Sequence, residues 1–367
     1  MYDGMIHWYG DYAGGTGYST AATGNVLALD KAGYKVRAIP LYYGEIDERS
    51  PVHKFSLVDS SKSPKEKKMR VMHSLPYTIK SGIDGQYTVF EFDRIPYQWL
   101  EVLKHDVKVI FTPSQFSKNS MVNTGVPAQK IFVAWHPIFG NPPEKYERGI
   151  FEGVKESFKF LSVFEWVIRK RTDILIKAFV EEFDEKEDVA LILKTHGKDI
   201  GRQINKYGAN KHVYLMNDMV DRIDKLYRAA DVYVSAPAGE GFGLTLAEAM
   251  ALGVPTISSK YGGQLEFMNE KNSWLCEVGR LEPVGHWKEN TLPYIVTPSM
   301  KWRVPDIDSL RSLLRETYNE FKGKSIEERL NHPKVREAMK VVDQLSLENV
   351  GKQLSIGIEW WNDKYGT

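Results

Sequence analysis

The sequence has almost no cysteine, almost no net charge and no long apolar run. Among its 367 residues the single cysteine, Cys276, excludes an intrachain disulfide and is typical of a reducing compartment. A net charge of +1 gives no field that would attract nucleic acid, so none is expected as a partner. No stretch reaches the roughly 18 uninterrupted apolar residues of a membrane span, and residues 1–10 lack the apolar core of a signal peptide. We therefore expect a cytoplasmic protein without a transmembrane segment.

What the sequence does contain is an alternation of strands and helices. Hydrophobic residues make up 42% of the chain and charged residues 26%, as in soluble globular proteins, and 367 residues are too many for one compact core. Runs rich in β-branched and aromatic residues alternate with segments of helical spacing, which predicts parallel sheets covered on both faces. The expected strands of the first half are 4–10, 34–43, 69–74, 87–93, 107–114 and 130–135, with helices at 18–33, 95–104 and 115–124.

Proline, glycine and charged residues interrupt this alternation at 136–149, which we interpret as a linker. The alternation then restarts, and from about residue 335 the chain is predicted to be helical to its end. We therefore expect two Rossmann-like α/β domains of similar size. The second set of expected strands is 158–166, 189–196, 212–218, 231–237 and 254–263, with helices at 172–183, 220–230 and 244–253.

The stretch EGFGLTLAEAMALGVP, residues 240–255, carries two glutamates in glycine-rich and apolar surroundings. It follows a near-continuous apolar run, which predicts a central parallel strand, and a helix is expected to begin near Leu244. In doubly wound sheets ligands bind at the carboxyl ends of the strands, and the free N–H groups of the following helix favour an acceptor-rich, often anionic ligand. Gly241 and Gly243 let the backbone approach such a ligand closely. Glu240 is therefore expected at the mouth of a ligand crevice.

Glu248 lies one to two turns into the expected helix, among Leu, Thr, Ala, Met and Val residues. A lone charge in such surroundings is unfavourable unless a partner holds it. A pair of ligand hydroxyls would satisfy the two carboxylate oxygens. The alternative is a structural pair with a neighbouring lysine or a backbone amide.

These motifs together resemble those of the retaining GT-B glycosyltransferases of family 4, also described as glycosyl transferases group 1. The two glutamates with seven residues between them, in EGFGLTLAEAMALGVPTISS, are similar to the family's specific motif, and YGGQLEFM resembles its next loop, with Glu266 in the usual place. VIRKRTDILIKAF, residues 167–179, is similar to the donor-phosphate segment and puts Lys170 at the basic position. AGGTGYS, residues 13–19, resembles the glycine-rich loop after the first strand. The resemblance covers essentially the whole chain.

The resemblance implies a GT-B fold, in which two Rossmann-like domains face each other across a cleft. Residues 1–145 would form the acceptor-side domain, with a C-terminal helix at 345–367 packing back on it, and residues 146–344 the nucleotide-sugar donor domain. The implied reaction moves a hexose from a nucleotide-diphosphate sugar to an acceptor hydroxyl with retention of anomeric configuration. The acceptor would be a carbohydrate, a lipid-linked molecule or another hydroxyl compound. No cofactor or metal ion is expected beside the nucleotide sugar, because no cluster has the spacing of metal ligands.

The resemblance also assigns roles to individual residues. Glu240 and the backbone amides of Phe242 and Gly243 would face the hydroxyls of the sugar, and Glu248 would hold those of the ribose. Lys170 would stabilise the leaving diphosphate, whose negative charge grows as its bond to the sugar breaks. The implied catalytic residues are Glu240, Lys170 and Asp93, and the implied donor-binding residues are Gly15, Thr16, Gly17, Arg169, Gly241, Phe242, Gly243, Leu244 and Glu248.

Two positions depart from the family's pattern. The family usually has an arginine five residues before the phosphate lysine, and this sequence has Glu165 there. Either Arg169 or Arg171 supplies the missing charge, or the donor is held differently. Many members also carry a histidine after the strand that here reads YTVFEFD, where this chain offers Glu91 and Asp93 to accept the acceptor's proton or orient its hydroxyl. A retaining reaction tolerates the loss of that histidine, because the leaving phosphate can take the proton.

Other functions fit the same pattern less well. A nicotinamide-dependent oxidoreductase would need Gly-x-Gly-x-x-Gly/Ala after the first strand and an acid about 20 residues later. This sequence has Thr20 at the third glycine position and no acid at the end of the second strand. Two alternatives stay open, a different GT-B enzyme such as a nucleotide-sugar epimerase and a non-catalytic carbohydrate-binding protein. The two-glutamate spacing disfavours the first, and the presence of all the motifs together disfavours the second.

Isolated histidines and one aspartate pair carry less weight. His7, His73, His136 and His196 lie at or near expected strand ends, where a structural or solvated histidine is the simpler interpretation. The segment DID at 306–308 imitates a metal-binding pair. It directly precedes an expected helix, which favours a capping role.

Overall fold

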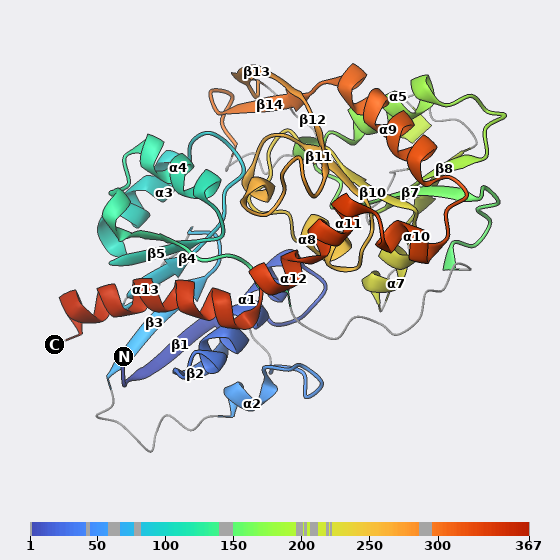
Figure 1. The fold of residues 1–367 in the computed structure, drawn as a ribbon. Coiled ribbons are helices and arrows are strands. Elements are labelled where there is room, and N and C mark those ends of the chain that lie inside the picture. The colour runs from blue at the N-terminus through green and yellow to red at the C-terminus, as the bar shows by residue number, and fades with distance from the viewer. Residues whose placement is uncertain are drawn as a thin grey trace. The chain divides into compact units, whose positions relative to one another are not determined.

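The computed structural model describes residues 2–41, 45–57, 67–76, 82–138, 150–195, 201, 204–205, 212–217, 220, 222–285 and 296–366. The chain forms two compact units, one of residues 1–139 with 343–367 and the other of residues 140–342 (Figure 1). We call them unit 1 and unit 2. Each is built on a parallel sheet with helices, so the predicted α/β class is confirmed.

Unit 1 contains a sheet whose six described strands run in the order β2-β1-β3-β4-β5-β6, all parallel. Parallel neighbours cannot be joined by a tight turn, so the chain crosses over between them, most often through a helix. The strands are β1 (Met5–Gly10), β2 (Lys35–Pro40), β3 (Lys68–His73), β4 (Gly85–Tyr87), β5 (Val109–Thr112) and β6 (Ile131–Val133). The helices are α1 (Gly17–Lys31), α2 (His53–Ser56), α3 (Tyr97–Glu101), the π-helix η2 (Val102–Asp106), α4 (Gln115–Thr124), the 3-10 helix η3 (Ala128–Lys130) and α13 (Leu347–Tyr365).

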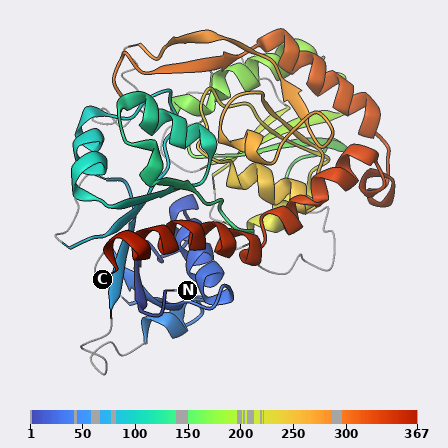
Figure 2. The same cartoon turned by 60° about the vertical axis from the view of Figure 1, so that its left-hand side comes forward.

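Helix α13, drawn in red in Figure 2, packs against α1 within unit 1. Gly351 permits this close approach, because a Cβ at that position would lie 2.5 Å from the carbonyl oxygen of Ala28. At the other end of α13 the Glu359 carboxylate accepts a hydrogen bond from the Tyr34 hydroxyl at 2.6 Å. The last helix of the chain is therefore part of the first unit's core.

Unit 2 contains a second sheet, whose six described strands run in the order β12-β11-β10-β7-β8-β9, again all parallel. A separate antiparallel pair, β13 and β14, is called here the β13–β14 ribbon. The strands are β7 (Phe158–Val163), β8 (Val189–Lys194), β9 (Val213–Met216), β10 (Val232–Ser235), β11 (Thr256–Ser259), β12 (Trp274–Cys276), β13 (Val278–Pro283) and β14 (Lys301–Pro305). The helices are η5 (Ile168–Lys170), α5 (Thr172–Glu182), α7 (Ile223–Ala229), α8 (Leu244–Ala251), η6 (Gly263–Glu266), α9 (Ile307–Phe321), α10 (Ile326–Leu330), α11 (Pro333–Met339) and α12 (Val341–Gln344), of which η5 and η6 are 3-10 helices.

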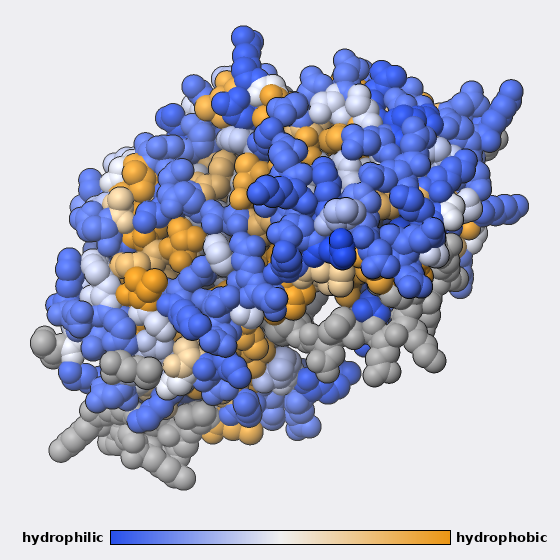
Figure 3. All heavy atoms as spheres, viewed as in Figure 1, coloured by the Kyte–Doolittle hydropathy of each residue, from blue (hydrophilic) through white to orange (hydrophobic). Residues whose placement is uncertain are grey.

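Helix α9 joins α5 through both apolar and charged side chains. Leu310 and Leu314 are buried in the core of unit 2. On the outer side Arg315 donates to Glu182 at 2.8 Å and to Glu187 at 2.6 Å. The surface over α9 is accordingly mainly hydrophilic in Figure 3, as is usual for an amphipathic helix.

One predicted strand of unit 1 is wrong. We expected a strand at 87–93, but β4 ends at Tyr87. Phe90 and Phe92 of this segment are buried, as the pattern predicted. The Thr88 amide still donates to the Phe111 carbonyl of β5 at 3.0 Å, but from Phe90 on the backbone bonds to side chains of a helix. Ser117 of α4 donates to the Phe90 carbonyl at 2.7 Å and accepts from the Phe90 amide at 3.2 Å, and Ser120 donates to the Phe92 carbonyl. Alternating burial therefore continues past the end of β4, where helix side chains and not a strand satisfy the backbone.

Candidate functional site

The turn that carries Glu240 connects the carboxyl end of β10 to α8 in unit 2. Every residue of β10 is buried, as expected from its apolar run, and so is every residue from 236 to 243. Helix α8 begins at Leu244, where the sequence predicted a helix start. Gly243 precedes it with φ of 94°, a left-handed conformation that favours glycine. The buried turn therefore leads through this glycine directly into the N-terminus of α8.

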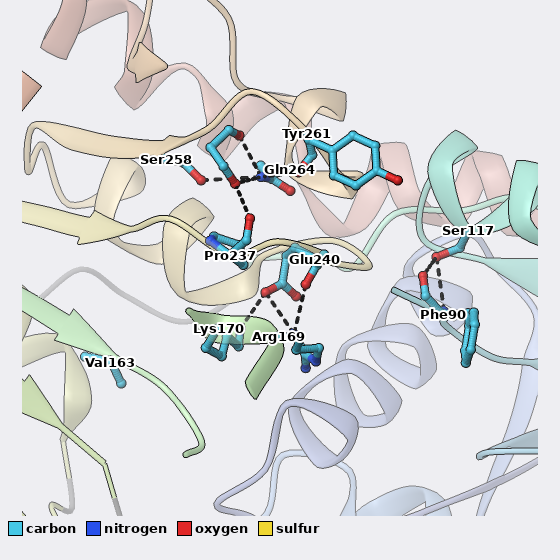
Figure 4. A network of polar contacts seen from close by, with 12 residues as sticks. Phe90, Ser117, Val163, Arg169, Lys170, Pro237, Glu240, Ser258, Tyr261 and Gln264 are labelled. Atoms are coloured by element: carbon cyan, nitrogen blue, oxygen red, sulfur yellow. Dashed lines mark hydrogen bonds and ion pairs between the residues drawn. The ribbon is translucent and has the colours of Figure 1, made fainter. Parts of the chain in front are cut away.

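The Glu240 carboxylate lies against two cations of a neighbouring loop (Figure 4). Lys170 Nζ donates to Oε2, and Arg169 Nη1 donates to the same oxygen at 3.3 Å. The residue is only 9% exposed. Burial alone would raise the pKa of this carboxyl, but the charges of Lys170 and then Arg169 outweigh burial and lower the pKa to about 2. Glu240 is therefore ionised at neutral pH and neutralised by its neighbours.

The loop that carries these cations is joined to the Glu240 turn through the backbone. The Ala238 amide donates to the Arg169 carbonyl at 2.8 Å. Arg171 follows in a left-handed conformation, and its guanidinium donates to Asp173 at 3.0 and 2.7 Å. Glu165, which stands where the family usually has an arginine, is exposed. Of the two arginines considered for the missing charge, the structure brings Arg169 to the carboxylate and Arg171 to an aspartate.

A second glycine turn, after β11, packs on the Glu240 turn. The Gly263 amide donates to the Glu240 carbonyl at 2.7 Å, and a Cβ on Gly263 would lie 2.0 Å from the Gly241 carbonyl oxygen. Gln264 is fully buried (Figure 4), and its side-chain amide donates to the carbonyl of Ser259, at the end of β11, and to that of Tyr261 in the loop that follows. Of this loop only Glu266 was expected at the site from the sequence, and the packing residues Gly263 and Gln264 were not. The paired glycines of YGGQLEFM could have indicated the close backbone approach.

Glu248 is half-buried on α8, and its described partner is a tyrosine hydroxyl. Tyr227 of α7 donates to Oε2 at 3.0 Å, and no described residue donates to Oε1. Burial raises the pKa of this carboxyl to about 7, against a lowering by the Tyr227 bond and with a further rise from the charge of Asp224. The partner is thus neither the lysine nor the backbone amide that the sequence suggested. Sequence reasoning missed it because the pairing depends on how α7 packs on α8.

The predicted glycine loop lies in unit 1, between β1 and α1. Residues 13–17 are exposed, and Gly15 has φ of 79°. Thr16 caps α1, since its hydroxyl oxygen accepts from the Ser19 amide at 3.1 Å, and Gly17 is the first helical residue. The loop therefore combines left-handed glycine with an exposed helix N-terminus. Its role at a donor diphosphate stays a prediction.

Asp93 also lies in unit 1, in the segment after β4. Its carboxylate accepts from Arg94 Nε at 3.1 Å, and its side chain is 13% exposed. The Asn123 amide donates to its backbone carbonyl at 3.2 Å. Glu91 is partly buried nearby in the chain. A role for either carboxylate towards an acceptor stays a prediction.

The three histidines of unit 1 that the sequence singled out, His7, His73 and His136, are buried, in agreement with a structural interpretation. His73 packs against Tyr87 with ring centroids 4.3 Å apart, and burial and then the charge of His136 lower the pKa of His73 well below its ordinary value. His136 Nδ1 lies 3.1 Å from the Tyr87 hydroxyl, and His7 is buried as well. His196 lies outside the described residues.

Two kinds of feature are absent from the residues that the structure describes, a cluster of metal ligands and a membrane-spanning helix. No group of three or more His, Cys, Asp or Glu side chains there could hold a metal ion. No helix of the described residues is long and apolar enough to cross a bilayer. The aspartate pair at 306–308 is explained by capping, because Asp306 Oδ1 accepts from the Ser309 amide at 2.8 Å at the start of α9. Independence from metal ions stays a prediction.

Comparison with known sequences identifies one segment of the chain. The family model described as Glycosyl transferases group 1 matches residues 146–283. The chain is 33% identical over 128 residues to the UDP-N-acetylglucosamine--peptide N-acetylglucosaminyltransferase GtfA subunit of Streptococcus agalactiae. The matched segment covers 33% of this chain and 24% of that protein. The chain is 34% identical over 134 residues to N-acetyl-alpha-D-glucosaminyl L-malate synthase of Bacillus anthracis, which covers 35% of this chain and 34% of that protein. The chain thus matches only about a quarter to a third of the length of these relatives.

Solved structures are similar over nearly the whole chain. Anabaena Alr3699/HepE, solved in complex with UDP-glucose, superposes with a TM-score of 0.66 at 14% identity, over 97% of this chain and all of that one. WaaG, a glycosyltransferase involved in lipopolysaccharide biosynthesis, superposes with a TM-score of 0.60 at 12% identity, over 99% of this chain and all of that one. At such low identity the likeness establishes the fold alone. The chain has the predicted GT-B fold, and the matched segment supports a glycosyltransferase.

Proposed function

We propose that this chain transfers a hexose from a nucleotide-diphosphate sugar to an acceptor hydroxyl with retention of anomeric configuration. The observation that carries the proposal is the pair of cations, Arg169 and Lys170, that converge on Glu240 beside the carboxyl end of β10. All three residues belong to the segment that matches the family model. Nucleotides bind at this edge of Rossmann-like sheets, and fixed cations there suit a leaving diphosphate.

The chemistry follows from where charge develops. When the bond between the anomeric carbon and the phosphate oxygen breaks, both bonding electrons stay on the diphosphate. Lys170 and Arg169 stabilise that charge, and the amides of Phe242 and Gly243 at the start of α8 add N–H donors. A diphosphate would compete with Glu240 for the two cations, which frees this carboxylate to accept hydrogen bonds from sugar hydroxyls. The leaving oxygen accepts the proton of the acceptor hydroxyl on the same face of the sugar, so the reaction needs no histidine base.

Glu248 would bind the ribose of the nucleotide. One oxygen already accepts from Tyr227, and the other accepts from no described residue, so the carboxylate has capacity for ribose hydroxyls. The Tyr227 bond also fixes the orientation of the carboxylate. Because burial makes the ionised form unfavourable in the empty protein, hydroxyl donors that stabilise the charge would bind with a net gain.

Uridine diphosphate sugars are the first donors to test. The curated GtfA relative is named for UDP-N-acetylglucosamine, and the HepE structure was solved with UDP-glucose. We therefore propose a UDP-hexose donor and leave the sugar to experiment. The proposed acceptor is a hydroxyl compound, whether a carbohydrate, a peptide side chain or a lipid-linked molecule.

Thermal unfolding with a panel of nucleotides tests the donor proposal. UDP or a UDP-sugar should stabilise the chain by about 2.7 kcal/mol at 100 times its dissociation constant. The gain should be smaller in Lys170→Ala and unchanged in Lys177→Ala, a matched lysine of α5 whose exposed ammonium pairs with Glu181 at 3.7 Å. Stabilisation by no nucleotide at all would contradict the proposal.

Analysis of the product by NMR then separates the possible functions. A glycosylated acceptor with the donor's anomeric configuration supports a retaining transferase. An inverted anomer refutes retention. Isomerisation of the nucleotide sugar without any acceptor indicates an epimerase, and binding without turnover indicates a carbohydrate-binding protein.

A further inference from the structure

Arg171 stands directly after Lys170 in a backbone conformation that arginine rarely adopts. Its φ is 46° and its ψ 42°, and among the residues that the structure describes it is the only non-glycine residue with positive φ. Contact between Cβ and the backbone disfavours this region, so a turn that makes no use of the side chain is better served by glycine or asparagine. The side chain makes no capping bond at the start of α5 either. The contacts of the guanidinium therefore have to explain why an arginine occupies this position.

The Arg171 guanidinium is held from two sides. Its Nε and Nη2 donate to the two carboxylate oxygens of Asp173 at 3.0 and 2.7 Å, a two-bond fork that restricts rotation. The guanidinium carbon lies 5.7 Å from the ring centre of Trp302 on β14, within the range of a cation–π contact. Only 11% of the Arg171 side chain is exposed, and Trp302 is 1% exposed. A charge fixed in such surroundings has little freedom to move.

The next residue of β14 contacts the other loops of the site. The Arg303 amide donates to the Ala238 carbonyl at 3.3 Å, and the Ala238 amide in turn donates to the Arg169 carbonyl at 2.8 Å. The Arg303 guanidinium lies 5.8 Å from the ring centre of Tyr261, in the loop after β11. The β13–β14 ribbon thus touches each of the loops that surround the Glu240 carboxylate.

We propose that Arg171 is a positioning residue for the donor site. Its guanidinium, clamped between Asp173 and Trp302, fixes the turn that presents the two neighbouring cations to Glu240. The catalytic consequence rests on the proposed function, because those cations are the ones assigned to the leaving diphosphate. A loose turn would carry the same charges at variable distances from the phosphate, and electrostatic catalysis requires groups that are fixed before the reaction.

Three variants separate the side chain from the backbone. Arg171→Gly removes the guanidinium and keeps the left-handed conformation accessible, so the turn itself is not strained. Arg171→Lys keeps the charge but cannot form the two-bond fork, and Trp302→Leu removes the ring. The matched control is Arg49→Gly in unit 1, which removes a fork to Asp47 of the same geometry, at 3.0 and 2.7 Å. Thermal melts identify any variant that fails to fold.

The first readout needs no substrate. In protein with 13C-labelled glutamate carboxyls, the Glu240 signal is identified by its absence from Glu240→Gln. With both cations in place Glu240 stays ionised, and its signal should not move between pH 7 and about 3.5, because its pKa is about 2. In Arg171→Gly the midpoint should rise by about one pH unit or more, with Arg171→Lys and Trp302→Leu between. Arg49→Gly should match the wild type. An unchanged Glu240 signal in folded Arg171→Gly overturns the proposal.

The second readout is kinetic. Arg171→Gly should lower kcat about tenfold while changing the dissociation constant of UDP less than about threefold. In a Lys170→Ala background the same substitution should have little further effect, since the group that it positions is already gone. If the losses of kcat caused by the two substitutions multiply in the double variant, the positioning role is overturned. A wild type that neither binds nor turns over any nucleotide sugar refutes the proposed function instead, and the Glu240 signal still decides on Arg171.

Discussion

Two regions of one short stretch, the turn before α8 and α8 itself, treat their glutamates in opposite ways. Glu240 in the turn accepts bonds from Lys170 and Arg169, and its pKa is lowered to about 2. Glu248 in the helix accepts from a tyrosine hydroxyl, and its pKa is raised to about 7. Burial acts on both carboxyls in the same direction. The difference therefore comes from the partners, two cations in one case and a neutral hydroxyl in the other.

This contrast divides the chemistry of the proposed site. Groups whose surroundings push their pKa values apart often have separate roles. Glu240 stays ionised at neutral pH, and under the proposed function it would hold the cations in place until a diphosphate binds. Glu248 titrates near neutrality, so its charge can respond to a ligand. A single substitution can test the environment of each glutamate separately.

The largest effect is expected from removing a cation at Glu240. Lys170→Ala should lower turnover by about 100- to 1000-fold, comparable with the loss of a donor to a developing oxyanion, because the lysine charge is needed most as the diphosphate leaves. Stability should change much less. Steady-state kinetics beside thermal melts measure both quantities, with Lys177→Ala as the control. Near-normal turnover would assign the task to Arg169 instead.

Removing the charge of Glu248 should weaken binding before it affects turnover. Hydrogen bonds to charged groups contribute about 1.5 to 3 kcal/mol, so Glu248→Gln should lower nucleotide affinity by about 10- to 100-fold. Calorimetric titration with UDP measures this change. Tyr227→Phe is the companion variant, because it leaves the carboxylate and removes only the bond that orients it.

The stability of the empty Glu248→Gln protein provides the control. The pKa of Glu248 lies above its ordinary value of 4.5, so the folded state holds a proton that the unfolded chain loses as pH rises from 4.5 towards 7. This residue's stabilising contribution is thus present below pH 4.5 and is lost as pH rises through about 7. The glutamine side chain does not ionise, so Glu248→Gln does not lose this stabilising contribution as the pH rises. The variant should therefore be no less stable than the wild type at pH 7. A lower melting temperature with unchanged UDP affinity would show that Glu248 has a structural role.

The titration of Glu248 should also appear in binding itself. If the ionised carboxylate receives the ribose hydroxyls, the binding-competent fraction rises from about 10% at pH 6 to about 90% at pH 8, and affinity should rise about tenfold. The phosphates of the nucleotide titrate near the same range. Glu248→Gln is therefore the reference, since it retains only the nucleotide's own pH dependence. Identical pH profiles for the two proteins would exclude Glu248 from the nucleotide site.

The sequence predicted this region well where local chemistry decides the structure. A buried apolar run became β10, and helix α8 begins at the predicted residue, Leu244. Asp306 caps its helix as expected. Each of these features depends on a few neighbouring residues, so a pattern in the sequence can indicate it.

Tertiary contacts decided what the sequence could not. Arg169 and not Arg171 reaches Glu240, and Arg171 stands in a left-handed turn that arginine rarely adopts, with its guanidinium against Asp173 and Trp302. The strand predicted at 87–93 failed for a similar reason, because serines of α4 bond to that backbone. In both cases a contact with a residue from another element, Trp302 of β14 or the serines of α4, lies outside any local sequence pattern.

The smallest effect is expected from removing metal ions. A divalent cation at the diphosphate would need carboxylate ligands, and the Glu240 carboxylate is already neutralised by Lys170 and Arg169. A metal in that position would repel both cations and would require Glu240 to leave them. We therefore expect EDTA to change the rate of sugar transfer less than about twofold, since the two side chains supply the charge that a metal would. Loss of activity in EDTA with recovery in Mn²⁺ would mean that Glu240 exchanges its cations for a metal when the donor binds. The opposite pKa shifts of Glu240 and Glu248 would then describe only the empty protein.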